Sequence, residues 1–312
     1  MNNPKTKKQL TLYLLLTFGI SWTFMIALIM PAALKLPADA TLQQRALVVV
    51  MEALVMFVPA VSALLTRLIT HDWTDCKLVP HFRGRVRWYL WGWFGPMLFM
   101  LIGVAFYFLL FPGDLSWEQA RQNMNAPGAT PLPATVVPGV VQLALLMLVC
   151  PLLNAVNCFG EEWGWRGFLF PKLMERDGSF VRSAIVAGLI WGIWHAPIIA
   201  VGHNYQQVIG TDPWWMVLAA IAAMCVVCVV LSLLFCYIAY KADAVWPAVL
   251  AHGALNGTAV FGIMLLANPD ASNAFIGPSP TGIVGGAAFV VAAVWVACRM
   301  RRKEDKDKPR GI

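Results

Sequence analysis

Long apolar runs alternate with short polar segments along almost the whole chain of 312 residues. A helix needs about 20 apolar residues to cross a bilayer. Eight segments reach roughly that length, at about residues 10–34, 46–66, 88–111, 137–159, 183–201, 214–240, 245–267 and 282–298. The pattern therefore predicts an all-α protein, a polytopic membrane helix bundle of about eight transmembrane helices that forms a single integral membrane domain over residues 1–312.

The composition agrees with this prediction. Hydrophobic residues make up 59% of the chain and charged residues only 12%, and the mean hydropathy is +0.68. Soluble domains carry about 25% charged residues, so the composition is typical of a membrane protein.

The basic residues indicate how the helices are threaded. All but three of the 23 Lys and Arg residues lie in the N-terminal segment, the loops after the second, fourth and sixth spans, and the C-terminal tail. The exceptions are Lys35, Arg45 and Arg121. Because basic residues in short loops stay in the cytoplasm, we expect both termini to be cytoplasmic. We expect a multi-pass protein of a prokaryotic cell membrane.

The largest group of basic residues is the tail, residues 299–312, which follows the last predicted span. Anionic lipid headgroups attract such a segment, so we expect them as partners of a basic cytoplasmic tail. The net charge of +7 then requires no nucleic acid to explain it.

A few polar residues lie inside the predicted spans or at their ends, where they are costly and often functional. The candidates are Glu161, Glu162, His195, His252 and Asn256.

The spacing in GEEWGWRGF, residues 160–168, separates the two acids. Glu162 and Arg166 are four residues apart on a helix, so they can pair. Glu161 is then left as the acid without a basic partner, and Trp165, four residues on, can shield it from water.

Two further spacings place the imidazoles. His252 and Asn256 are four residues apart and share a helix face. Gly188 and Gly192 form a small-residue face that lets a neighbouring helix approach, and His195 lies beside it. The estimated depths of these residues differ, so we expect a tilt, a break near Pro151 or a cytoplasmic vestibule to bring them together.

Each residue also has an ordinary structural interpretation, as an interfacial acid, a packed histidine or an interhelical hydrogen bond. The combination suits hydrolysis by activated water instead. Glu161 would be the general base, His195 would share that role or protonate the leaving amine, and His252 with Asn256 would donate to the oxyanion. A zinc site formed by Glu161, His195 and His252 is an open alternative, although the chain has no H-E-x-x-H motif.

Three motifs occur in order along the chain: E-E-x-x-x-R at residues 161–166, W-x-x-x-H at 191–195 and H-x-x-x-N at 252–256. They resemble the CAAX protease and bacteriocin-processing (CPBP, or Abi) family of intramembrane proteases, which is related to the type II CAAX prenyl endopeptidases. Trp191 departs from the pattern, which usually has Phe there.

The resemblance implies a catalytic core over residues 137–267. In that core Glu161 and His195 would activate water, Glu162 and Arg166 would support the site, and His252 with Asn256 would hold the oxyanion. It leaves both a divalent metal such as zinc and a metal-free mechanism open.

The sequence thus predicts an intramembrane endopeptidase, described for this family also as a metalloprotease, that cleaves a membrane-associated protein or peptide, lipidated or not. The first alternative is a catalytically silent membrane protein of the same fold that acts in bacteriocin immunity or partner binding. The second is a transporter, which the lack of an inverted repeat disfavours.

Overall fold

The computed structural model describes residues 3–37, 40–125, 147–268 and 273–307, and these residues form helices and no strand. The all-α prediction is therefore confirmed for the described part of the chain. The elements are α1 (Pro4–Phe24), the π-helix η1 (Met25–Ile29), α2 (Met30–Leu34), α3 (Leu42–Val55), α4 (Val58–Thr70), α5 (Val86–Leu110), the 3₁₀ turn η2 (Pro112–Asp114), α6 (Trp117–Asn125), α8 (Ala155–Gly164), the π-helix η3 (Trp165–Leu169), α9 (Phe170–Asp177), α10 (Phe180–Trp194), α11 (Ala196–Ile199), α12 (Trp214–Ala242), α13 (Trp246–Thr258), α14 (Phe261–Met264) and α15 (Ala287–Asp307).

Five helical stretches of the described residues are long and apolar enough to cross a membrane. They are Pro4–Leu34, Gln43–Thr70, Val86–Leu110, Trp214–Ala242 and Trp246–Met264. Together they identify a membrane protein, and they coincide with five of the predicted spans. The total of eight stays a prediction.

The other three predicted spans differ from the simple pattern. Much of 137–159 lies outside the described residues. The predicted segment 183–201 overlaps α10, which begins at Phe180, is only 15 residues long and ends at Trp194. The last span was predicted from residue 282, but α15 begins at Ala287 and continues through the charged residues to Asp307.

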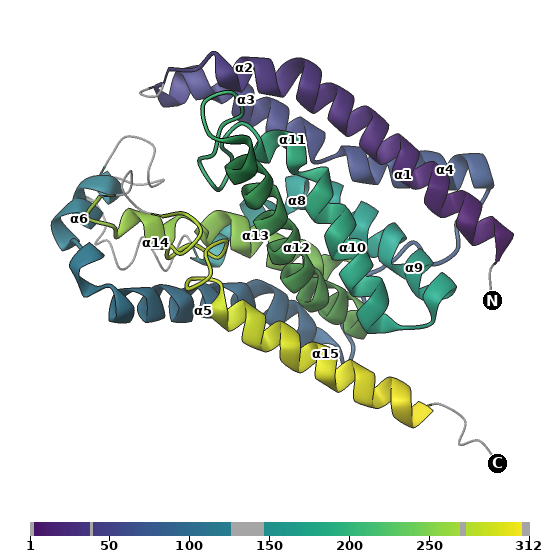
Figure 1. Cartoon of the computed structure of the whole chain (residues 1–312). Helices are drawn as coiled ribbons and strands as arrows, with labels where there is room; N and C mark the ends of the chain where they lie inside the picture. The colour runs from purple at the N-terminus through teal and green to yellow at the C-terminus, as the bar shows by residue number, and fades with distance from the viewer. Residues whose placement is uncertain (1–2, 38–39, 126–146, 269–272, 308–312) are drawn as a thin grey trace.

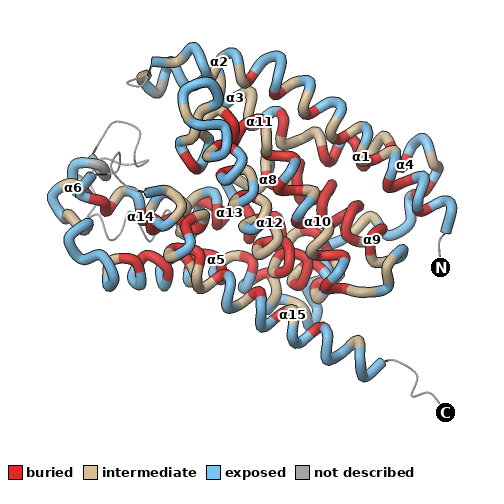
Figure 2. The backbone as a smooth tube through the Cα atoms, viewed as in Figure 1, coloured by how far each residue is buried: buried red, intermediate tan, exposed pale blue. Residues whose placement is uncertain are grey.

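The helices form layers (Figure 1). α1 and α4 pack on one side, α5 and α15 lie on the other, and α8, α10, α12 and α13 lie between them. Buried residues concentrate in these central helices, whereas the outer helices present many exposed positions (Figure 2). The polar candidates therefore lie in the best-packed part of the molecule.

The start of α1 and the end of α15 lie at the same end of the bundle (Figure 1). Asn3 donates a hydrogen bond to Glu175 at the end of α9, and Glu304 of α15 accepts one from the backbone N–H of Phe180 at the start of α10. The first and last described residues of the chain therefore flank the same end of the bundle. Which side of a membrane this end faces stays a prediction.

Candidate active site

The two acids lie on α8, a short helix with a distinct beginning and end. Residues 147–153 are helical, and a bend at Asn154 separates them from α8. The predicted break near Pro151 is therefore present. At the other end α8 continues into the π-helix η3, a widened turn of the kind often found at functional sites.

Gly160 allows α8 to lie against the segment between α3 and α4. A Cβ atom on Gly160 would meet the backbone oxygen of Met56 at 2.7 Å and the Cα atom of Phe57 at 2.8 Å. The backbones are therefore closer than any side chain permits, which is how small residues act in membrane helix packing. This contact fixes the height and rotation of the acids that follow.

Glu161 is buried, with 2% of its surface exposed. Its Oε2 atom accepts hydrogen bonds from the indole nitrogens of Trp165, at 3.2 Å, and Trp191, at 2.6 Å. No described residue donates a hydrogen bond to its Oε1 atom, and this atom is not completely buried. Glu161 is thus held through one oxygen and keeps the other for a further partner.

Glu162 is fully buried and bonds to two bases through one oxygen. Its Oε1 atom lies 2.8 Å from Nη1 of Arg166 and 2.9 Å from Nδ1 of His252. The predicted pairing of Glu162 with Arg166 is present. The contact with His252 joins α8 to α13 and fixes the orientation of that imidazole, leaving its Nε2 atom without a described partner.

His195 lies where α10 ends. Pro197 cannot continue a regular helix, and the backbone N–H of His195 bonds back to Gly192 rather than to Trp191. The carbonyl oxygen of Trp191 instead lies 2.8 Å from the His195 Nδ1 atom, which donates to it. The neutral ring therefore carries its proton on Nδ1, so the Nε2 lone pair is available as an acceptor.

Small residues hold α10 against α12, as predicted. A Cβ atom on Gly188 would lie 2.5 Å from the Cα of Val229, and one on Gly192 would lie 2.5 Å from the Cα of Cys225. This approach keeps His195 in the interior, with 8% of its surface exposed.

Trp191 contacts every charged or imidazole group of the cluster except Glu162. Besides donating to Glu161, its ring lies 5.8 Å from the His195 ring and 5.4 Å from the His252 ring, centroid to centroid. The Arg166 guanidinium stacks 4.4 Å above it. Trp191 therefore contacts both imidazoles as well as Glu161 and Arg166.

Asn256 lies apart from this cluster. It is exposed on the face of α13 that carries His252, one turn further on, and its amide nitrogen lies 3.8 Å from Sγ of Cys158. The shared face is as predicted. His252 and Asn256 contact Glu162 and Cys158, which are one turn apart on α8, so the two helices are antiparallel here.

The structure does not assemble the predicted zinc ligands. Among the described residues, no three His, Cys, Asp or Glu side chains are grouped as a metal ion requires. The donor atoms left without described partners are Oε1 of Glu161 and Nε2 of the two imidazoles, but the three side chains do not converge as the ligands of one ion. Glu161, His195 and His252 do not fit a metal in this arrangement, so the steps proposed below use protein side chains alone.

One contributor could not be recognised in the sequence. Phe235 of α12 lies 6.0 Å from the His252 ring and 5.3 Å from the Arg166 guanidinium. It stands in the apolar run SLLFCYIAY, where nothing distinguishes it from a residue that faces lipid.

Two comparisons with known proteins find similar sequences. Residues 140–258 match the family described as type II CAAX prenyl endopeptidase Rce1-like. A curated relative, CAAX prenyl protease 2 of Methanococcus maripaludis, is 40% identical over 55 residues, which are 18% of this chain and 20% of the relative. The matched part thus spans about a fifth of that relative's length. Residues 140–258, which include all the candidate residues, are therefore similar to the Rce1-like type II CAAX prenyl endopeptidases, as the three motifs indicated.

Proposed function

We propose that this protein is an intramembrane endopeptidase that hydrolyses a peptide bond of a membrane-associated protein or peptide, and that Glu161 activates the water. The observation that supports this most directly is the state of Glu161, a buried carboxylate anchored through Oε2 with Oε1 left open. The family match supports a protease of this general kind.

In the proposed reaction Oε1 of Glu161 removes a proton from a water molecule. The oxygen of that water then attacks the carbonyl carbon of the scissile peptide bond. A positioned base of this sort contributes roughly 10²- to 10⁴-fold in rate. The carbonyl carbon becomes tetrahedral, and the former carbonyl oxygen becomes a negatively charged oxyanion. The proton is then passed to the leaving nitrogen, directly or through Nε2 of His195, and the C–N bond breaks.

His252 is the group proposed to stabilise the oxyanion. Glu162, which is itself paired with Arg166, holds the His252 ring through Nδ1, so the Nε2–H of the imidazolium form would point away from that pair. A single oxyanion donor is typically worth about 3–4 kcal/mol of barrier. Asn256, exposed one turn away, is proposed to bind the substrate backbone beside the scissile bond.

The test uses the full chain purified in detergent and a library of membrane-anchored peptides. We expect cleavage by the wild type and by Glu118→Gln, whose exposed acid pairs with Arg121 far from the site. Glu161→Gln and His252→Ala are expected to lose at least a hundredfold in kcat. Cleavage that survives Glu161→Ala would remove this assignment.

The same variants address the alternative function. A catalytically silent protein, acting in bacteriocin immunity or partner binding, should retain its biological activity as Glu161→Gln. If Glu161→Gln abolished both the biological activity and peptide cleavage, the alternative would be rejected. Metal analysis of the same purified samples addresses the proposed metal-free route, because stoichiometric zinc would contradict it.

A further inference from the structure

A long groove lies between α5, α12 and α15, and its lining includes Phe235, which also packs against Trp191 of α10. Its volume is about 800 Å³, within the range of sites that hold small ligands. Aromatic and aliphatic side chains line most of it, including Trp91, Phe99, Phe289 and Trp295. Among the lining residues, the charged ones are Arg87, Lys241 and Arg299, and none is acidic.

These three cations stand at one end of the groove. Arg87 is at the start of α5, Lys241 is at the end of α12, and Arg299 follows the apolar part of α15. The groove runs along α5 from Arg87 to Ile102, fifteen residues or about 22 Å of helix. One leaflet of a bilayer is about 15 Å thick in its hydrocarbon part, so the groove is long enough for an acyl chain.

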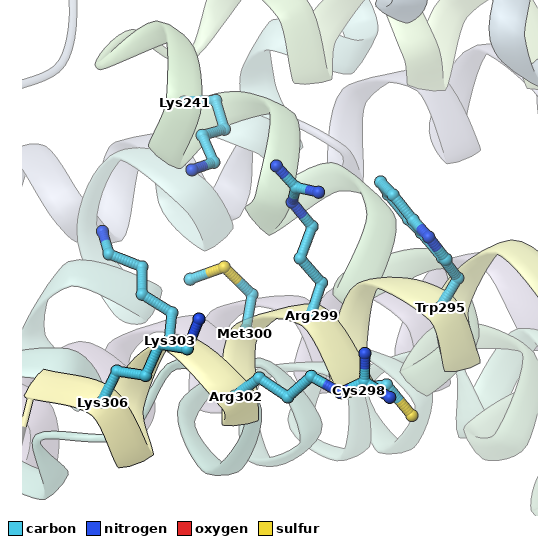
Figure 3. A pocket seen from close by; sticks show the side chains of 8 residues that line it. All are labelled: Lys241, Trp295, Cys298, Arg299, Met300, Arg302, Lys303 and Lys306. Atoms are coloured by element: carbon cyan, nitrogen blue, oxygen red, sulfur yellow. The ribbon is translucent and has the colours of Figure 1, made fainter.

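A second cavity of about 450 Å³ adjoins the cationic end. It shares Lys241, Trp295 and Arg299 with the groove and adds Arg302, Lys303 and Lys306. In Figure 3, Trp295, Arg299 and Lys303 rise from α15 toward α12, from which Lys241 points toward them. Lys241 and Lys303 both lie over the Tyr240 ring, each 5.9 Å from its centroid.

The positive charges here are not compensated within the described part of the chain. None of Lys241, Arg299 and Lys303 is within 4.0 Å of a described carboxylate, and no acidic side chain lines either cavity. Glu304, next to Lys303, is directed to Ser179 and Phe180 at the start of α10, and Asp243, two residues after Lys241, pairs with Lys77 and Arg85. A concentration of like charges of this kind favours an anionic ligand.

We propose that these joined cavities bind an anionic phospholipid. One acyl chain lies in the groove, and the phosphate lies among Lys241, Arg299 and Lys303. The headgroup pocket and the chain groove meet at Trp295, a residue type that favours the boundary between headgroups and hydrocarbon. This proposal does not depend on the peptidase activity.

The test measures which lipid remains bound to the purified protein. Full-length protein is equilibrated with equimolar phosphatidylglycerol and phosphatidylcholine of identical chains, and the bound lipid is quantified by native mass spectrometry. We expect phosphatidylglycerol to be enriched on the wild type. A triple variant, Lys241→Gln, Arg299→Gln and Lys303→Gln, should reduce this enrichment about tenfold or more.

A matched control removes the same charge elsewhere. Lys7, Lys8 and Arg83 are exposed and line neither cavity, so replacing all three with Gln should leave the enrichment unchanged. A second variant, Ala292→Trp, fills the groove while keeping every cation, and should also reduce retention of phosphatidylglycerol. Unfolding midpoints of all variants show whether each is folded.

Three results would overturn the proposal. Equal losses in the two triple variants would mean that only the overall charge matters. Full retention in a folded Ala292→Trp protein would mean that no chain occupies the groove. Displacement of phosphatidylglycerol by inorganic phosphate at the headgroup concentration would mean that the site takes a free anion rather than a lipid.

Discussion

At the scale of single residues, the candidate site depends on which hydrogen-bond partners each acid has. Among the described residues, Glu161 accepts hydrogen bonds only from indoles, whereas Glu162 bonds to Arg166 and His252. Two adjacent carboxylates therefore differ in environment although they differ by only one position in the chain. Such a difference is what assigns neighbouring acids to different roles in a reaction.

Trp191→Phe is expected to lower kcat about tenfold and leave KM unchanged. An aromatic ring remains beside both imidazoles, but Glu161 loses the shorter of its two N–H donors. A hydrogen bond to a charged group contributes about 1.5–3 kcal/mol. The measurement is steady-state cleavage of one peptide, with Trp214→Phe, an exposed residue at the start of α12, as the control. A Trp191→Phe enzyme as fast as the wild type would contradict this role for the indole.

Contacts within one helix could be predicted from spacing, and contacts between helices could not. The pairs Glu162–Arg166 and Glu161–Trp165 follow from their four-residue separation. The bond from Trp191 to Glu161 and the packing of Phe235 arise only when α10 and α12 meet α8. An isolated chain position carries no signal of these partners.

At the scale of the elements, close helix contacts and interrupted helices form the site. α8 begins after a bend, α10 stops at His195, and both pack through glycines. Segments of this kind read as continuous spans by hydropathy, because hydropathy records composition and not the direction of the chain. The predicted spans were therefore most accurate for the uninterrupted helices α5 and α12.

Gly160→Ala is expected to lower the free energy of unfolding by about 1–3 kcal/mol and to reduce cleavage. The added methyl group meets backbone atoms of residues 56 and 57, which cannot rotate away as a side chain would, so α8 must shift. Reversible unfolding in mixed micelles gives the measurement. The control is Gly19→Ala in α1, where a Cβ atom has no neighbour within 4 Å and helix propensity improves. Equal effects at the two glycines would argue against a tight α8 contact.

At the scale of the whole molecule, a buried carboxylate joins elements at the end of the bundle that carries most basic residues. Asp72, after α4, accepts hydrogen bonds from Gln9 of α1, from Thr74 and from Lys172 of α9. Burial alone would raise the pKa of Asp72, but these hydrogen bonds outweigh it and hold the pKa well below its usual range. Ionised Asp72 therefore holds α1 to α9, the helix that follows Glu161 and Glu162 in the chain.

This arrangement predicts how stability depends on pH. Because the folded state lowers the pKa of Asp72, its contribution is fully present above the unfolded-state value of about 3.9 and is lost as pH falls toward the folded-state value. The unfolding midpoint of the wild type should fall as the pH is lowered from 5 to 3. Asp72→Asn should be less stable at pH 7 and change less over that interval, while Glu118→Gln should follow the wild type. Parallel curves for wild type and Asp72→Asn would refute the assignment.

The π-helical turn at Trp165–Leu169 limits which deletions the chain can tolerate. Each residue of a helix advances its side chain by about 100° around the axis, so removing one residue here would rotate everything beyond it by that angle. Glu162 on one side of the turn and Lys172 on the other both point inward now. A shortened chain could keep only one of them so oriented, so the π-helical turn sets the rotation of α9, which carries Lys172, relative to α8, which carries the two acids.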